Sequence, residues 1–271
     1  MSDEMLLYEK RDDGVALITL NRPTRLNALL PEMGDVMSDL FDDAEADEAV
    51  RCVALTGAGR AFTAGGDVKA MAEDRDLASG GAANSIDELA RNLADWGWKV
   101  SGRLYNMPKP TVALVNGFAM GAGLSMALAC DIRICSSQAK FGTAFRNVAL
   151  SGDFGGSWFL PRIAGHAVAS ELYLTGEIID ADRALALGLA NHVVPHEEFM
   201  DAGLEFCAQI AAGPPLAMGR MKLNLQRSDS LSLREALLAE AMHHTLSSHD
   251  EDHASATQAF VKKETPVFRG R

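Results

Sequence analysis

Short runs of β-branched and aliphatic residues mark the first half of the chain. The runs at 15–20 (VALITL), 51–56 (RCVALT) and 111–115 (TVALV) each end in a turn that contains glycine, asparagine or proline. This is the pattern of a buried strand followed by a loop. A similar run at 132–135 predicts a fourth strand.

Between these runs the apolar residues recur at three and four positions, which predicts amphipathic helices. One helix is expected over 31–46 and another over 86–104, where a proline at 108 ends the pattern. A short apolar helix is expected over 125–130, and the polar, glycine-rich stretch 73–85 predicts a surface loop. Strands and helices that alternate in this way predict an α/β core.

The pattern changes after residue 195, where helical segments follow one another without a convincing strand. They are predicted at 199–212, 215–226, 231–246 and 250–261. We therefore divide the chain into an α/β core over residues 1–195 and a helical region over residues 196–271.

The composition of the chain limits the kinds of molecule that it is expected to bind. The 271 residues, 48% of them apolar, can bury a substantial core in one large domain or two. A net charge of −12 argues against binding to nucleic acid or to an anionic membrane, although a few local cations could hold a small anion. The four cysteines have neither metal-ligand nor disulfide spacing, so we expect no metal site.

The amino-terminal sequence bears on localisation. The acidic start MSDEMLLYEK lacks the basic and apolar regions of a secretory signal. The longest apolar stretch, 118–130, is shorter than the roughly 20 residues that span a bilayer. We therefore expect a cytoplasmic protein.

Two glycine-rich stretches follow predicted strands and carry the candidate chemistry. Residues 61–69 (AFTAGGDVK) contain adjacent glycines, which let the chain turn tightly and leave N–H groups uncovered. Residues 116–126 (NGFAMGAGLSM) lead into an apolar helix, whose start offers free N–H donors and the positive end of a dipole. The first stretch alone could be a simple tight turn, whereas the helix start in the second could hold an anion or a developing oxyanion. Dinucleotide and P-loop spacings are absent, and the match of 123–127 to a serine nucleophile elbow is incomplete.

These stretches form part of a longer series of motifs. With 21–29 before them and 139–142, 155–156, 160–162, 174–176, 184–188, 194–195 and 260–271 after them, they resemble the enoyl-CoA hydratase/isomerase (crotonase) superfamily over almost the whole chain. The resemblance implies a spiral of β-β-α units with a carboxy-terminal helical region that takes part in oligomerisation and covers CoA. It also implies an acyl-CoA thioester substrate and a homotrimer or dimer of trimers. No cofactor is expected, because CoA is part of the substrate.

The resemblance assigns the oxyanion hole to the backbone N–H groups of Gly66 and Ala122. Two fixed donors would stabilise the enolate oxygen of a thioester without reorganising. The family usually has glycine in the position of Ala122, but a backbone donor does not depend on its side chain. Further contacts with CoA or the acyl group are implied for Arg25, Leu26, Ala64, Asp67, Val68, Lys69, Phe145, Phe260 and Lys263. Of these, Phe260 and Lys263 would come from a neighbouring subunit, and the three cations could equally be solvated surface charges.

The reaction depends on which side chains handle protons. The two positions that carry glutamates in hydratases of the superfamily correspond here to Ser125 and Phe145, neither of which exchanges protons near neutral pH. Asp153 corresponds to a functional aspartate of dienoyl-CoA isomerases, ring-epoxide phenylacetyl-CoA isomerases and a dehalogenase of the superfamily, and it is our candidate catalytic residue. The alternative is that Asp153 caps the following helix or accepts backbone hydrogen bonds in a glycine turn.

One carboxylate is enough for an isomerase, because it can take a proton from one carbon and return it to another. Phe145, Phe154 and Trp158 are expected to surround Asp153 with apolar groups, which would raise its pKa. We therefore predict isomerisation of an unsaturated acyl-CoA. Hydration, or a CoA-binding homologue without activity, remain as alternatives.

Overall fold

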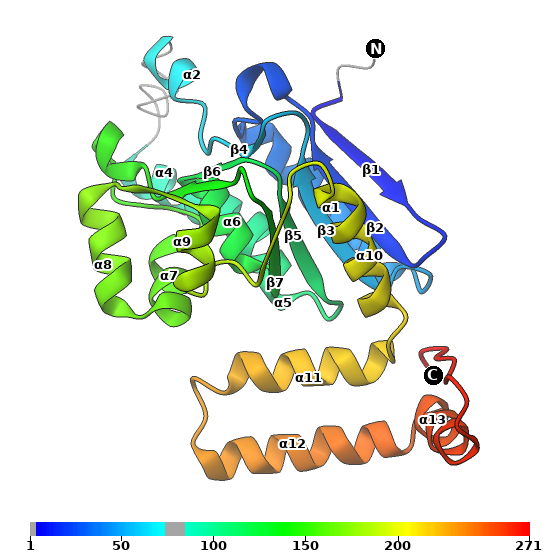
Figure 1. The fold of residues 1–271 in the computed structure, drawn as a ribbon. Coiled ribbons are helices and arrows are strands. Elements are labelled where there is room, and N and C mark those ends of the chain that lie inside the picture. The colour runs from blue at the N-terminus through cyan, green and yellow to red at the C-terminus, as the bar shows by residue number, and fades with distance from the viewer. Residues whose placement is uncertain (1–3, 74–84) are drawn as a thin grey trace.

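Two β-sheets and the helices around them form the core of the molecule (Figure 1). The computed structural model describes residues 4–73 and 85–271. In these ranges the larger sheet has six strands in the order β1-β2-β3-β5-β7-β10. They are β1 (Leu6–Lys10), β2 (Val15–Leu20), β3 (Cys52–Gly57), β5 (Thr111–Val115), β7 (Ile132–Ser136) and β10 (His192–Val194). All pair in parallel except β1, which pairs antiparallel with β2.

The central strands are buried on both faces, which explains their continuous apolar sequences. In β2, Val15 and Leu17 pack in one cluster with Phe199 of α10 (Phe199–Ala211). Ala16 and Ile18 point the other way, into the cluster that includes the buried face of α1 (Pro31–Ala46). The four strands expected from the sequence are confirmed, with boundaries shifted by a residue.

The smaller sheet was not expected from the hydrophobic pattern. It consists of β4 (Ala61–Thr63), β6 (Phe118–Met120), β8 (Lys140–Gly142) and β9 (Ile178–Asp180), in the order β4-β6-β8-β9. Each of β4, β6 and β8 closely follows a strand of the larger sheet, and a helical segment follows it in turn. The chain therefore winds as a spiral of β-β-α units, as the family resemblance implied.

Several helices cover the sheets. The expected helix over 86–104 is realised as α4, a π-helical turn η2 and α5. The helix expected over 125–130 begins earlier, at Ala122, because Gly121 takes a positive φ of 53° and turns the chain directly from β6 into α6. Only the ends of the expected loop 73–85 lie inside the described residues. The helices concerned are α2 (Val68–Glu73), α4 (Ile86–Gly97), η2 (Trp98–Gly102), α5 (Arg103–Asn106), α6 (Ala122–Ala129), α7 (Gly156–Ala164), α8 (His166–Thr175) and α9 (Ala181–Ala186).

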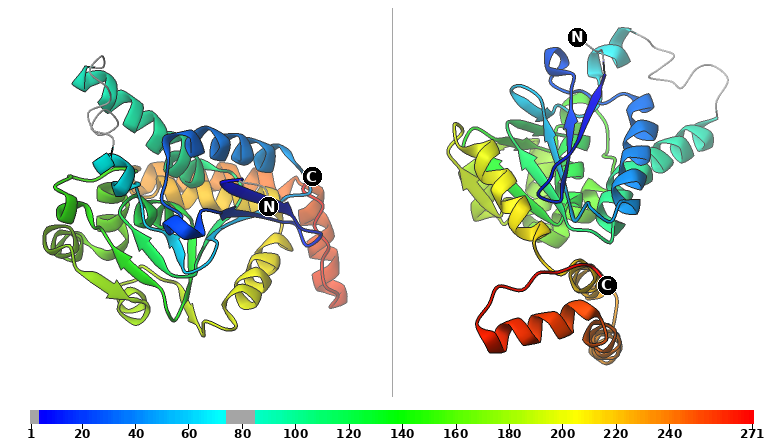
Figure 2. Two further views of the ribbon diagram at one scale, coloured as in Figure 1. Left: turned by 90° about the horizontal axis from the view of Figure 1, so that it is seen from above. Right: turned by 90° about the vertical axis from the view of Figure 1, so that its right-hand side faces the viewer.

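The last three helices form an arm that lies apart from the sheets (Figures 1 and 2). They are α11 (Pro215–Arg227), α12 (Leu233–Ser248) and α13 (Glu251–Lys262). The expected helix over 231–246 starts two positions later, because Ser232 and Glu235 form a capping box at its start. No described helix combines the length and the apolar character needed to cross a membrane. The functional division of the chain at residue 195 stays a prediction.

Candidate active site

The two glycine-rich stretches lie side by side because they follow adjacent strands of the smaller sheet. β4 pairs in parallel with β6, with Thr63 opposite Ala119. Gly65, just beyond β4, has a φ of +83°, and a Cβ atom placed on it would lie 2.6 Å from Met120 O and 3.4 Å from Ala122 N. Only glycine fits there, and its close approach brings the amide of Gly66 beside that of Ala122.

Both amides are free to bind a ligand oxygen. Ala122 is the first residue of α6, so its N–H has no partner within the helix. Leu29 N–H donates to Gly65 O at 2.8 Å, while the N–H of Gly66 donates to none of the residues that the structure describes. Gly121 N–H donates to Gly142 O at 2.9 Å, which holds the start of α6 against β8. Two donors on fixed backbone can stabilise one developing oxyanion.

An ion pair supports the turn that carries Gly66. Arg22 Nη2 lies 3.3 Å from Asp67 Oδ2, and Arg22 also donates to Ala28 O. Asp67 Oδ1 accepts a hydrogen bond from Ala70 N–H at 3.1 Å. Burial alone would raise the pKa of Asp67, but Ala70 N–H and Arg22 outweigh it and lower that pKa. The Asp67 carboxylate is thus already engaged in holding the chain around Gly66.

The remaining residues expected to contact CoA fall into two places. Leu26 O accepts a hydrogen bond from Ala64 N–H at 2.9 Å, so the segment that carries exposed Arg25 borders the turn at Gly66. Val68 and Lys69 are exposed on the first turn of α2. Phe260 and Lys263 instead lie at the α13 end of the molecule, remote from α2 (Figure 1). Within one chain the structure therefore does not bring these two residues to the site.

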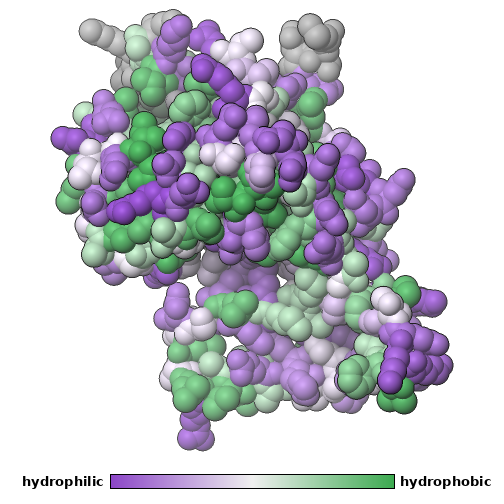
Figure 3. All heavy atoms as spheres, viewed as in Figure 1, coloured by the Kyte–Doolittle hydropathy of each residue, from purple (hydrophilic) through white to green (hydrophobic). Residues whose placement is uncertain are grey.

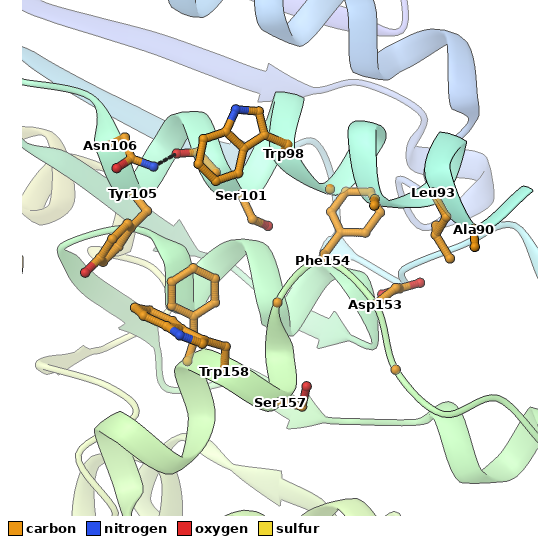
Figure 4. Close-up of a pocket in the computed structure, with 16 residues that line it drawn as sticks. Ala90, Leu93, Trp98, Ser101, Tyr105, Asn106, Asp153, Phe154, Ser157 and Trp158 are labelled. Carbon is orange, nitrogen blue, oxygen red and sulfur yellow. Dashed lines mark hydrogen bonds between the residues drawn. The ribbon is translucent and has the colours of Figure 1, made fainter. Parts of the chain in front are cut away.

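Asp153 faces a cavity of about 680 Å³ between α4–α5 and the start of α7 (Figure 4). Figure 4 shows its side chain near Leu93, with Trp98 and Trp158 at the other end of the cavity. The Oδ1 atom of Asp153 is buried and accepts no hydrogen bond from the described residues. Because burial disfavours the charged form, the pKa of Asp153 rises to about 6.

The alternative role of Asp153 as a helix cap is wrong. The N-cap of α7 is Gly155, and no side chain caps that helix. The backbone, not the carboxylate, of Asp153 takes part in the turn: its carbonyl accepts from Gly156 N–H at 3.1 Å and from Ser125 Oγ at 3.2 Å. This leaves the carboxylate free for chemistry. Of the three expected aromatic neighbours, Phe154 and Trp158 line the cavity.

The third, Phe145, belongs to a different cluster, beside Gly121 and Tyr173. Its ring lies close to Gly121, where a Cβ atom would come within 3.5 Å, and it stacks on Tyr173 with ring centroids 6.0 Å apart. The hydroxyl of Tyr173 is buried without a hydrogen-bond partner among the described residues. Burial and the charge of Asp153 raise the pKa of Tyr173 to about 12. No sequence pattern singles out Tyr173, which stands in the apolar run of α8.

Comparison with known proteins agrees with this geometry. A family model described as enoyl-CoA hydratase/isomerase matches residues 10–271. The 1,2-epoxyphenylacetyl-CoA isomerase of Escherichia coli is 35% identical over 260 residues, which cover 96% of this chain and 97% of the relative. The short-chain-enoyl-CoA hydratase of Clostridium acetobutylicum is 36% identical over 255 residues, 94% of each chain. The solved structure of an enoyl-CoA hydratase from Bacillus anthracis has a TM-score of 0.90 at 28% identity and covers 99% of this chain and 100% of its own.

Proposed function

Since the chain belongs to the enoyl-CoA hydratase/isomerase family, we propose that it shifts the double bond of an unsaturated acyl-CoA thioester, with Asp153 as the proton carrier. The observation that carries the proposal is a partly buried carboxylate of raised pKa that faces the cavity. It is combined with Ser125 and Phe145 at the two positions that the family resemblance gives to the glutamates of hydratases. One carboxylate is enough to move a proton between two carbons.

In this proposal the thioester oxygen accepts hydrogen bonds from the N–H groups of Gly66 and Ala122. These bonds strengthen as the oxygen becomes negative, so they favour the dienolate over the substrate. The Asp153 carboxylate takes a proton from one carbon of the acyl chain, and the electron pair of that C–H bond enters the dienolate. The Asp153 carboxyl then returns the proton to another carbon, and the double bond ends in its new place.

The pKa of Asp153 suits this double role. A carboxyl with a pKa of about 6 is ionised at neutral pH but is a stronger base than an ordinary carboxylate. It therefore takes the substrate proton more readily and still releases it within the same site. The charged groups Arg25 and Lys69, at the exposed edge beside Gly66, would attract the phosphates of CoA.

Hydration is the second candidate, because the 36% identical relative from Clostridium acetobutylicum is a hydratase. Adding water to a double bond needs one group to activate the water and another to protonate the acyl carbon. Asp153 could fill one of these roles, and a second acid or base would have to fill the other. An inactive CoA-binding homologue is the third candidate.

We also propose assembly into a homotrimer or a dimer of trimers. Large apolar side chains lie open on the arm, among them Leu225, Leu233 and Phe260, which are 75%, 76% and 85% exposed (Figure 3). Exposed apolar surface of this extent favours burial against another chain. A neighbouring arm would also be the means by which Phe260 and Lys263 reach a site, as the sequence suggested.

The decisive experiment is to incubate the protein with 3-enoyl-CoA and 2-enoyl-CoA thioesters of several lengths and to identify the products by mass. A double-bond shift at unchanged mass, absent in Asp153→Asn, is expected. Gain of the mass of water would replace the isomerase proposal by the hydratase. No product at any length, with CoA thioester binding intact, would favour the inactive homologue.

A further inference from the structure

Two polar atoms of complementary character are buried at the site, one on Asp153 and one on Tyr173. The Oδ1 atom of Asp153 and the hydroxyl of Tyr173 have no hydrogen-bond partner among the described residues. One is an acceptor and the other a donor, and a buried polar atom without a partner is costly. The charge of Asp153 adds to the effect of burial in raising the pKa of Tyr173.

The backbone around Asp153 leaves room for the Tyr173 hydroxyl. A Cβ atom on Gly156 would lie 2.6 Å from Tyr173 Oη and 2.4 Å from Ser125 Oγ. A Cβ atom on Gly152 would lie 3.3 Å from the Tyr173 ring. Because glycine has no Cβ atom, Gly152 and Gly156 leave space for the Tyr173 phenol beside the turn that carries Asp153.

From this arrangement we propose that Tyr173 is a positioning residue, whose O–H donates a hydrogen bond to the Asp153 carboxylate when a bound thioester closes the cavity. The inference rests on the proposed function for its catalytic consequence. The phenol keeps its proton at neutral pH because its own pKa is raised to about 12. A hydrogen bond from a neutral donor orients the carboxylate and favours its ionised form.

No other charge competes for Asp153 in the described part of the chain. Burial is the one cause of its raised pKa. On the elements that pack against α8, Arg146 of η3 (Phe145–Val148) donates to Thr175 O, and Arg162 of α7 lies over the ring of Trp158. Glu171 and His166, on α8 itself, are exposed. Tyr173, by contrast, brings a buried hydroxyl without a partner among the described residues to the turn that carries Asp153.

The test is Tyr173→Phe in the full chain. This variant is expected to fold, because the hydroxyl that it removes makes no hydrogen bond in the structure. Tyr8→Phe is the matched control, since Tyr8 bonds to Asp43 at the exposed edge of β1. In Tyr173→Phe the acid limb of the kcat profile should move up by about one pH unit, so that kcat on the acid side falls about tenfold. KM and the control should be unchanged, and a profile equal to that of the wild type would overturn the inference.

A second readout separates this inference from the proposed function. The Asp153 carboxyl is titrated by ¹³C NMR in the complex with a saturated acyl-CoA, which cannot be isomerised, with Asp153→Asn to identify the signal. A higher pKa in Tyr173→Phe than in the wild type supports the role of Tyr173 whether or not turnover is found. Equal pKa values in the two proteins would overturn that role, even if isomerisation is observed.

Discussion

Replacing Asp153 by asparagine should make the protein more stable while it abolishes isomerisation. Asparagine has the shape of aspartate and stays neutral, as the protonated acid does. In the folded chain the carboxylate is partly buried, its Oδ1 atom has no partner among the described residues, and its pKa rises from the ordinary 3.8 to about 6. The ionised form is therefore less favourable in the folded chain than in the unfolded chain by about 3 kcal/mol.

The sign of the pH dependence follows from the same comparison. Between pH 3.8 and about 6 the folded chain binds more protons at this group than the unfolded chain does. The contribution of Asp153 to the free energy of unfolding therefore falls as the pH rises through this window. Asp153→Asn has no carboxyl to ionise at this position. Its free energy of unfolding should therefore equal that of the wild type below pH 4 and exceed it by up to about 3 kcal/mol above pH 7.

The assay is thermal and urea unfolding of both proteins at pH 4 and pH 8. For a chain of 271 residues the gain corresponds to roughly 5 °C in Tm at the higher pH. Asp67→Asn is the control of opposite sign, because the pKa of Asp67 is lowered in the folded chain and its charge is paired with Arg22. A wild type that is as stable as Asp153→Asn at pH 8, or a difference that does not change with pH, would refute the reasoning.

Three further outcomes are expected. The profile of kcat/KM should rise as the pH rises through about 6, because Asp153 must be ionised to accept a proton; a midpoint near 4 would contradict its burial. Gly65→Ala should lower kcat by about 100-fold or more, since the new methyl would press on Met120 O and displace the amide of Gly66. Steady-state kinetics would measure kcat, and circular dichroism would check that the variant folds. Full activity would exclude this geometry. Ser232→Ala should destabilise α12 by about 1 kcal/mol through loss of its capping box, seen as faster amide exchange at the start of that helix, with unchanged exchange as the contrary result.

The long buried strands could be predicted from the sequence because the residues of each strand are by themselves enough to indicate it. β2, β3, β5 and β7 are five or six residues each and are covered on both faces, so each appears as a continuous apolar run. The strands of the smaller sheet have three residues each, which is too short for a periodicity to show. Their pairing is set by contacts between segments far apart in the chain, and only the family resemblance anticipated it.

The site was predictable to a similar degree. Gly66, Ala122 and Asp153 stand in motifs with recognisable spacing, and the structure sets the first two side by side and the third in a cavity. Tyr173 could not be found in this way, because its importance comes from the glycines that face it across the fold. The early start of α6 depends on one positive φ at Gly121, which the hydrophobic pattern does not encode.

The smaller sheet positions the amides of Gly66 and Ala122, but it does not carry the side chains of Asp153 and Tyr173. Neighbouring strands lie about 4.8 Å apart whatever their side chains, so the pairing of β4 with β6 brings the ends of these strands together, and with them the segments that carry the amides of Gly66 and Ala122. Mutations of side chains that leave Gly65 in place should hardly disturb this arrangement. Asp153 and Tyr173 come from other segments, the turn before α7 and the helix α8. A descendant of this chain could therefore exchange the carboxylate that we propose as proton carrier, and with it the type of reaction, while the two amides that we propose to bind the thioester carbonyl stay in place.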